Sequence, residues 1–157
     1  MVENKSPIVM GCDHAALGLK EEIKALLKEK AIPVQDAGTH SLDSVDYPDY
    51  GIKVAAMVSS GEFERGILIC GTGLGMSMTA NRFAGVRAAL CTDLFSAAMS
   101  RKHNDANILV LGARVTGVGL ALEIVKTWLD TPFEGGRHQL RIDKFNRLGT
   151  PAERKTP

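Results

Sequence analysis

The sequence has little that would mark a secreted or membrane protein. Its three cysteines, Cys12, Cys70 and Cys91, are odd in number and far apart, which favours neither a disulfide framework nor a cysteine-based metal site. No apolar run approaches the roughly 20 residues that cross a bilayer, and residues 1–6 lack the apolar segment of a signal peptide. We therefore expect a cytoplasmic protein with no membrane partner.

An excess of charge of one sign is also missing. Nineteen Lys and Arg face 18 Asp and Glu, so the formal net charge is only +1, and a nucleic-acid partner is not expected. The chain of 157 residues is 45% hydrophobic, enough for one substantial core. We expect a single domain over residues 1–148 and a disordered tail over residues 149–157.

Short apolar runs alternate with segments of helical periodicity. This order predicts βαβ crossovers and a three-layer α/β/α fold with a five-stranded, mostly parallel, Rossmann-like sheet and a C-terminal helical tail. The polar stretch 39–49 is expected to be a loop over one sheet edge. Strands are expected at 8–12, 33–36, 66–70, 86–91 and 108–111, and helices at about 16–28, 49–60, 76–82, 94–102 and 118–129.

Residues with reactive side chains follow several of the predicted strands. Asp13 and His14 follow the first strand, Cys70 ends the third and Arg114 follows the fifth. Ligands of an open parallel sheet bind at the carboxyl ends of its strands. We therefore expect a carboxylate, an imidazole, a thiol and a guanidinium to share one rim.

The segment Gly71–Thr72–Gly73–Leu74–Gly75 is the most informative turn. Its alternating glycines allow backbone amides to approach a ligand and to face negative charge. Met76 stands where a third glycine of the G-x-G-x-x-G pattern would be, and no lysine follows as in a nucleotide-binding phosphate loop. The glycines alone fit an anion cradle and a plain tight turn about equally.

Cys70 lies where the predicted strand meets this turn, and a helix N-terminus there would stabilise a thiolate. It is a candidate general base, although a buried core thiol is the commoner explanation of such a cysteine. Cys12 and Cys91, which no glycine turn follows, are expected to be core thiols.

Two of the four histidines have polar neighbours, His14 and His103, and either could exchange a proton near neutral pH. A metal site of Asp13, His14 and His103 is conceivable, but adjacent residues rarely both bind one ion, and we expect no metal. His40 and His138 are expected to be exposed to solvent.

Arg137 and Arg141 would lie on one face of a helix and could together bind a phosphate, with a solvated basic face as the alternative. Arg114, at the end of a strand, is a third candidate. Tyr47, in a loop, either covers a ligand or packs against the protein.

Four separated motifs together resemble the ribose-5-phosphate isomerase B family, whose relatives include allose-6-phosphate and galactose-6-phosphate isomerases. The resemblance spans about residues 8–148. The motifs are Gly11-Cys12-Asp13-His14-Ala15-Ala16, Asp46-Tyr47-Pro48-Asp49-Tyr50, Cys70-Gly71-Thr72-Gly73-Leu74-Gly75 and Arg101-Lys102-His103-Asn104.

The resemblance implies a cofactor-free isomerase of ribose 5-phosphate and ribulose 5-phosphate that forms a homodimer, or a dimer of dimers, with active sites at the subunit interface. Cys70 would move the proton between C2 and C1, and His103 would open the sugar ring with the help of Asp13. Thr72 and the amides of residues 71–75 would hold the enediolate oxygens. A second branch of the family uses a glutamate in this loop, where the present chain has Met76.

The resemblance also implies further substrate contacts, some of them from the partner subunit. Those for the phosphate are His14, Arg137 and Arg141, and the others include Tyr47, Asn104 and Arg114. Three alternatives stay open: a six-carbon aldose-phosphate isomerase, a non-catalytic sugar-phosphate-binding module, and a metal-dependent isomerase or hydrolase.

Overall fold

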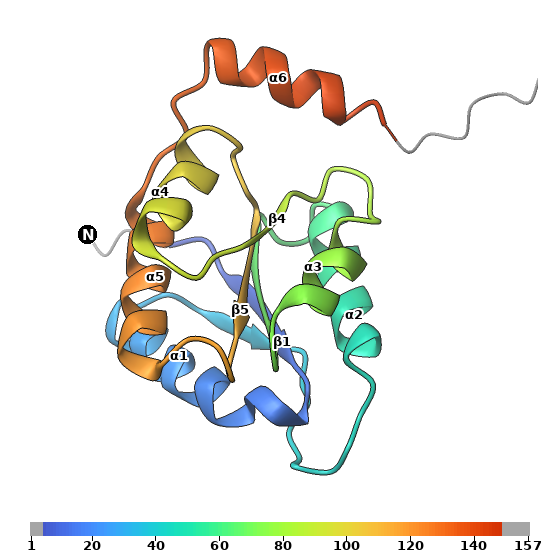
Figure 1. Cartoon of the computed structure of the whole chain (residues 1–157), viewed down its shortest axis with the longest axis vertical. Helices are drawn as coiled ribbons and strands as arrows, with labels where there is room; N and C mark the ends of the chain where they lie inside the picture. The colour runs from blue at the N-terminus through green and yellow to red at the C-terminus, as the bar shows by residue number, and fades with distance from the viewer. Residues whose placement is uncertain (1–4, 149–157) are drawn as a thin grey trace, which may run out of the picture.

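The structure, a computed structural model, describes residues 5–148. Within this range one five-stranded sheet has the order β2-β1-β3-β5-β4, and every pair of neighbouring strands is parallel. Helices cover both of its faces (Figure 1), which confirms the three-layer α/β/α prediction. The strands are β1 (Ile8–Cys12), β2 (Val34–Asp36), β3 (Arg65–Cys70), β4 (Ala88–Leu90) and β5 (Ile108–Gly112).

The three central strands are β1, β3 and β5, the longest apolar runs of the sequence. Nearly every residue in them is buried, as expected of parallel strands covered on both faces. Their register pairs Cys12 with Ile69 and Cys70 with Gly112, so the three strands end side by side. The edge strand β4 is shorter than the predicted 86–91, since pairing with β5 covers only three residues.

The helices form two layers. α1 and α4 both pack against α5 on one face of the sheet, whereas α2 packs against α3 on the other (Figure 1). A short 3-10 turn, His14–Ala16, precedes the first helix. The helices are α1 (Leu17–Glu29), α2 (Tyr47–Ser59), α3 (Leu74–Ala80), α4 (Leu94–Lys102), α5 (Val118–Asp130) and α6 (Arg137–Phe145).

Two helices differ from the prediction in their boundaries. α2 begins at Tyr47, inside the stretch predicted as loop, because Pro48 occupies the first turn, where its missing N–H costs no hydrogen bond. α3 begins at Leu74, inside the predicted turn, and ends at Ala80 rather than near Arg82. The first difference matters for function, since it puts Tyr47 on a helix end rather than in a loop.

The core consists of two apolar clusters, one on each face of the sheet. Trp128 of α5 is fully buried in the first cluster. The guanidinium groups of Arg65 and Arg101 lie 5.5 and 5.7 Å from its ring, within the range of cation–π attraction. This packing ties the end of α4 to the core.

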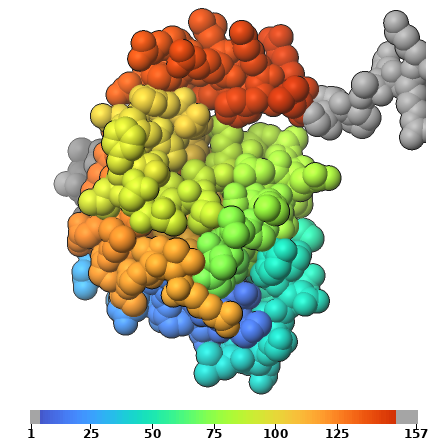
Figure 2. Space-filling view, in the orientation of Figure 1, coloured from blue at the N-terminus to red at the C-terminus, as the bar shows by residue number. Residues whose placement is uncertain are grey.

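The last helix, α6, lies across the end of the sheet where the strands begin (Figures 1 and 2). Its buried side chains are His138 and Ile142, four residues apart on one face. The helical tail is therefore confirmed. The tail predicted to be disordered, residues 149–157, lies outside the described residues.

None of the helices within residues 5–148 is both long enough and apolar enough to span a membrane.

Candidate functional site

The carboxyl ends of β1, β3 and β5 lie side by side at one end of the sheet, which we call the carboxyl edge. The opposite end, where the strands begin, is called the amino edge. The amide of Asp13 donates to the carbonyl of Ile69 at 3.3 Å, and the amide of Arg114 donates to the carbonyl of Gly71 at 2.9 Å. These bonds extend the strand pairing by a residue or two beyond the sheet. Asp13, Cys70 and Arg114 therefore come to one rim, as the sequence predicted.

The Cys70 thiol accepts a backbone hydrogen bond at this rim. Its Sγ lies 3.1 Å from the amide nitrogen of Gly73, and the residue is 4% exposed. Gly73 has a φ of +82°, and a Cβ there would lie 2.5 Å from the side chain of Leu90, so glycine is required for the turn. An amide aimed at sulfur stabilises a thiolate more than a thiol.

The other two cysteines have different surroundings. Burial raises the pKa of Cys12 to about 11, against a smaller opposing effect of Lys20. Burial likewise raises the pKa of Cys91 to about 11. Both are core thiols, as expected, and both stay protonated at neutral pH.

The glycine turn uses two of its own amides. Gly73 donates to Cys70, and Leu74 donates to the hydroxyl of Thr72 at 3.3 Å. The first amides of a helix have no acceptor within it, which applies here to Gly75 and Met76 of α3. The amides of Gly75 and Met76 can thus donate to a ligand, while those of Gly73 and Leu74 hold the shape of the turn.

Asp13 and His14 are fixed by backbone contacts. The carboxylate of Asp13 accepts from the amide of Ala15 at 3.0 Å and caps the 3-10 turn. The Nδ1 of His14 accepts from the amide of Val45 at 3.1 Å, which leaves the hydrogen of the neutral ring on Nε2. The fully buried Lys20 donates to the carbonyl of Thr39 at 2.6 Å and so holds the start of the same loop.

Two larger side chains flank the glycine turn. A Cβ on Gly75 would collide with the ring of Tyr47, and a Cβ on Gly71 would lie 3.5 Å from Cδ of Arg114. Gly75 is therefore required for the phenol ring to pack against the backbone, whereas the contact at Gly71 is an ordinary van der Waals distance that a side chain would allow. Tyr47 and Arg114 stand on either side of the turn that holds Cys70.

The remaining predicted site residues lie at the other end of the sheet. His103 follows α4 and Asn104 comes next, ahead of β5, while Arg137 and Arg141 lie on α6 (Figure 1). A five-residue strand separates this amino-terminal edge from the carboxyl edge by about 16 Å. One chain therefore divides the predicted site into two groups.

Two arginines hold the turn that follows α4. Arg101 is 5% exposed and donates to the carboxylate of Asp105 at 2.8 Å and to the carbonyl of Ala106 at 2.7 Å. Arg87 donates to the carbonyls of Asn104 and Asp105 at 3.1 and 2.9 Å. The guanidinium groups of Arg101 and Arg87 thus fix the main chain that carries His103 and Asn104.

His138 was predicted to be exposed, and that prediction is wrong. The residue is only 5% exposed, and its ring stacks on His103 with centroids 4.2 Å apart. Burial, the neighbouring charge of His103 and the two arginines of α6 lower the pKa of His138, against an opposing effect of Glu134. The signal in the sequence was its spacing of four from Ile142, which places both on the buried face. His40 is exposed, as predicted.

A single chain does not assemble the alternative metal site of Asp13, His14 and His103. His103 lies at the opposite edge of the sheet from the other two. Among the described residues, the group of three or more side chains that could share an ion is His103, Glu134 and His138.

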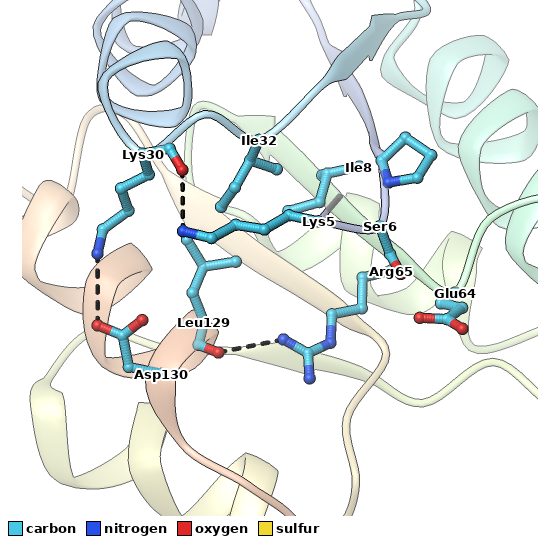
Figure 3. A pocket seen from close by; sticks show the side chains of 10 residues that line it. Lys5, Ser6, Ile8, Lys30, Ile32, Glu64, Arg65, Leu129 and Asp130 are labelled. Carbon is cyan, nitrogen blue, oxygen red and sulfur yellow. Dashed lines mark hydrogen bonds and ion pairs between the residues drawn. The ribbon is translucent and has the colours of Figure 1, made fainter. Parts of the chain in front are cut away.

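Two hollows lie away from the glycine turn. One of about 280 Å³ is lined by Lys5, Arg65 and the ion pair of Lys30 with Asp130, and it contains none of the predicted site residues (Figure 3). The other, about 980 Å³, is a groove between the end of α6 and residues 81–89, and Asn104 lines it. The groove adjoins the amino-edge group.

Comparison with known proteins identifies the family. Residues 8–145 match the family described as Ribose/Galactose Isomerase. The chain is 52% identical to ribose-5-phosphate isomerase B of Escherichia coli over 141 residues, which cover 90% of this chain and 95% of that protein. The chain belongs to the ribose/galactose isomerase family, and it is an aldose–ketose isomerase.

Solved structures agree in fold. Ribose-5-phosphate isomerase B of Clostridium thermocellum is 56% identical, with a TM-score of 0.88 over 89% of this chain and 95% of that chain. The enzyme of Mycoplasma genitalium, solved with bound ribulose 5-phosphate, is 42% identical, with a TM-score of 0.89 over 93% of this chain and 97% of that chain.

Proposed function

We propose that the protein interconverts ribose 5-phosphate and ribulose 5-phosphate, with Cys70 as the base. The observation that carries the proposal is the Cys70 thiol at the end of β3, with the Gly73 amide 3.1 Å from its sulfur. Among the three cysteines it alone combines a strand end, an amide donor and a rim shared with Asp13. The relatives named ribose-5-phosphate isomerase B support the choice of substrate.

The reaction moves one proton between neighbouring carbons. The Cys70 thiolate takes the proton from C2 of the open-chain aldose, which leaves a thiol and an enediolate, and the thiol returns that proton to C1. O2 loses its proton and O1 gains one, so no electron acceptor is needed. Preorganised amide donors at an enediolate oxygen contribute a few kcal/mol each, and the mouth of the glycine turn supplies such donors.

The complete site requires a second copy of the chain. Ring opening by His103 and phosphate binding by Arg137 and Arg141 are assigned to residues about 16 Å from Cys70 along the sheet. A homodimer that places the amino edge of one copy against the carboxyl edge of the other would join them. The exposed apolar side chains Leu140, Phe145 and Leu148 near α6, and Leu74 and Met78 on α3, provide surface for such a contact.

The same arrangement assigns the other polar contacts. His14 completes the phosphate site from the carboxyl edge, and Asn104 and Arg114 contact the sugar, with Tyr47 covering it. Phosphate bound far from the reacting carbons supplies energy that orients C1 and C2. Dimers could pair further into tetramers through the same class of apolar surface.

We also propose that the enzyme works in the cytoplasm, without a cofactor, a nucleic acid or a membrane. Its three cysteines are unpaired and buried, as is usual in a reducing compartment. The proton transfer above involves only groups of this chain and its partner copy.

A six-carbon aldose phosphate is the second candidate substrate. The matching family is described by galactose as well as ribose, and the loop of residues 39–46 beside His14 would set the depth of the sugar site. The mechanism would be unchanged. A panel of ribose, allose and galactose phosphates separates the two candidates by the ratio of their kcat/KM values.

The test is conversion of ribose 5-phosphate by the wild type, Cys70→Ser and Cys91→Ser, with EDTA present and folding checked by circular dichroism. We expect kcat to fall by about 100-fold or more in Cys70→Ser and to stay within about threefold in the control Cys91→Ser, since Cys91 is a core thiol. Equal turnover of wild type and Cys70→Ser would eliminate the thiol as base. A wild type active only on six-carbon phosphates would select the second candidate.

A further inference from the structure

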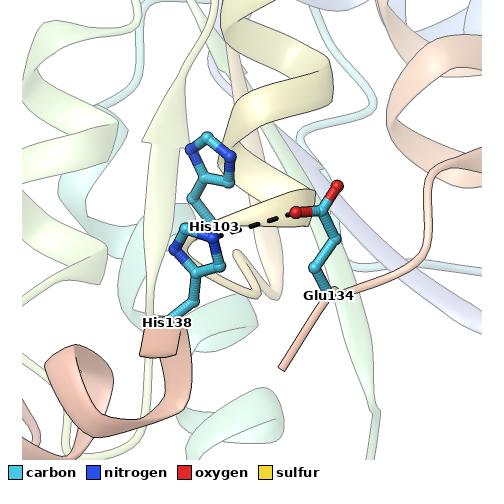
Figure 4. Close-up of side chains that lie close together, drawn as sticks. All are labelled: His103, Glu134 and His138. Carbon is cyan, nitrogen blue, oxygen red and sulfur yellow. Dashed lines mark ion pairs between the residues drawn. The ribbon is translucent and has the colours of Figure 1, made fainter. Parts of the chain in front are cut away.

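Three potential metal ligands converge at the amino-terminal edge, outside the glycine turn. His103 ends α4, His138 lies in the first turn of α6, and Glu134 belongs to the segment between α5 and α6 (Figure 4). One ligand atom from each side chain lies within 4.8 Å of the other two. The three come from separate elements, so the fold itself brings them together.

The two imidazoles stack on each other, and within the described residues neither ring makes a side-chain hydrogen bond. The hydrogen bonds found for residues 5–148 include none from a ring nitrogen of His103 or His138. The nearest partner of His138 is Glu134, whose carboxylate lies 3.8 Å from Nε2, beyond hydrogen-bond distance. The His138 side chain as a whole is 6% exposed.

We propose that His103, Glu134 and His138 bind a divalent transition-metal ion of the zinc class. Two imidazoles and one carboxylate are the ligand set of many zinc sites that keep the fourth position open to water. Bonds of about 2.1 Å in a tetrahedral site place ligand atoms about 3.4 Å apart. The separations, now up to 4.8 Å, need to shrink by up to about 1.4 Å, and the stacked rings need to turn so that their nitrogen lone pairs converge on the ion. Glu134, 49% exposed, can rotate inward when its contact with Lys102 breaks.

The surrounding charges make this a site of moderate affinity. Lys102 lies 3.7 Å from the Glu134 carboxylate and competes with an ion for it. Arg137 and Arg141 on α6 add positive charge near His138. Magnesium and calcium prefer oxygen ligands, so among divalent ions this set selects those that accept imidazole.

An ion at this site would inhibit the enzyme. This consequence rests on the proposed function, in which His103 donates a proton during ring opening. A ring nitrogen bonded to a metal has no proton to give. The metal would therefore act as an inhibitor, and full activity would need a chelator or low free zinc.

The binding experiment uses the full-length protein at pH 7.5 and Co²⁺ as a coloured substitute for Zn²⁺. We expect d–d absorption bands that saturate at one ion per chain and disappear when Zn²⁺ is added. Glu134→Gln and His138→Gln should each weaken the binding by at least about tenfold, and Glu134→Gln changes an exposed residue that folding does not need. The control His40→Ala removes an exposed histidine and should bind as the wild type does.

Inhibition is measured separately, as the concentration of Zn²⁺ that halves isomerase activity. Glu134→Gln should keep the basal activity and need at least about tenfold more Zn²⁺. Absence of cobalt bands at millimolar Co²⁺, or bands that both ligand variants leave unchanged, would overturn the site. Failure of the proposed function would instead appear as an inactive wild type whose cobalt spectrum still depends on Glu134 and His138.

Discussion

The two edges of the sheet are built in different ways. At the carboxyl edge, Asp13, Cys70 and Arg114 are placed by strand register and by main-chain hydrogen bonds of 2.9 to 3.3 Å. At the amino edge, His103 is placed by side chains: a guanidinium buried under the α4 turn and an imidazole stacked at 4.2 Å. The first edge depends on backbone geometry and glycine, and the second on buried charge.

This difference suggests a division of labour. In the proposed mechanism, the group that meets the reacting carbons, Cys70, is held by the backbone, where few rotatable bonds separate it from the core. The arginines proposed to bind the phosphate, Arg137 and Arg141, have long side chains on α6, a helix that only partly covers the domain. If the active site joins the two edges from different copies, each chain supplies one half to each of two sites.

The prediction with the largest expected effect combines two variants of the chain, one inactivated at the carboxyl edge and the other at the amino edge. Cys70→Ser and His103→Ala should each lower kcat by about 100-fold or more, since each removes a group that transfers a proton. When the two variants are coexpressed with different tags, half of the dimers are mixed. Each mixed dimer contains one intact site, so activity should recover to about one quarter of wild type.

The matched control pairs two variants of the same edge, Cys70→Ser with Asp13→Asn. Every site in such a mixture lacks one carboxyl-edge group, and activity should stay low. Absence of recovery in the first mixture, although mixed dimers are isolated by their tags, would show that each site is built from one chain. Recovery in the control would show that Cys70 and Asp13 of one site come from different copies, against the proposed division.

The next prediction has a smaller expected effect and compares the reactivity of the three cysteine thiols. Burial raises the pKa of Cys12 and Cys91 to about 11, so at pH 8 about one part in a thousand of each is thiolate, the reactive form. Iodoacetamide should therefore label Cys70 at least about tenfold faster than either. Labelling of the two core thiols should rise as pH approaches 11, because their proton is lost there.

Peptide mass spectrometry after timed alkylation measures the three rates, and urea-unfolded protein is the control in which all three cysteines should react alike. Saturating sugar phosphate should protect Cys70 and leave the others unchanged. Labelling of Cys12 before Cys70 in the folded protein would contradict the assignment of Cys70 as the most reactive of the three thiols.

The sequence predicted the carboxyl edge better than the amino edge, and the reason is physical. Apolar runs such as residues 66–70 predict a buried strand, and parallel strands bring their ends together without any knowledge of side-chain packing. The glycines of residues 71–75 likewise predict a close approach of other atoms. Alternating strands and helices were therefore enough to place Cys70 beside Asp13 and Arg114.

The amino edge depends on contacts between elements that are distant in sequence. The polar neighbours of His138 in the chain, Arg137 and Gln139, give no sign of burial, yet the docking of α6 buries it against His103. Nothing local predicts that Glu134 would approach both. The start of α2 at Tyr47 differs from the prediction for a simpler reason: proline favours loops in general but also suits the first turn of a helix, where Pro48 lies.

The smallest expected effect tests whether glycine at the carboxyl edge serves packing. Alanine normally stabilises a helix over glycine by about 0.5–1 kcal/mol, and Gly18→Ala in α1, with open space around it, should show this gain in urea unfolding. Gly75→Ala in α3 meets the Tyr47 ring instead. We expect no gain in the free energy of unfolding and a KM raised several-fold, since the ring must move from its place over the turn. If Gly75→Ala gained as much stability as Gly18→Ala with KM unchanged, Tyr47 would not be held against the turn in solution. One observation behind the contrast would then be lost, namely that backbone geometry and glycine position the groups at the carboxyl edge.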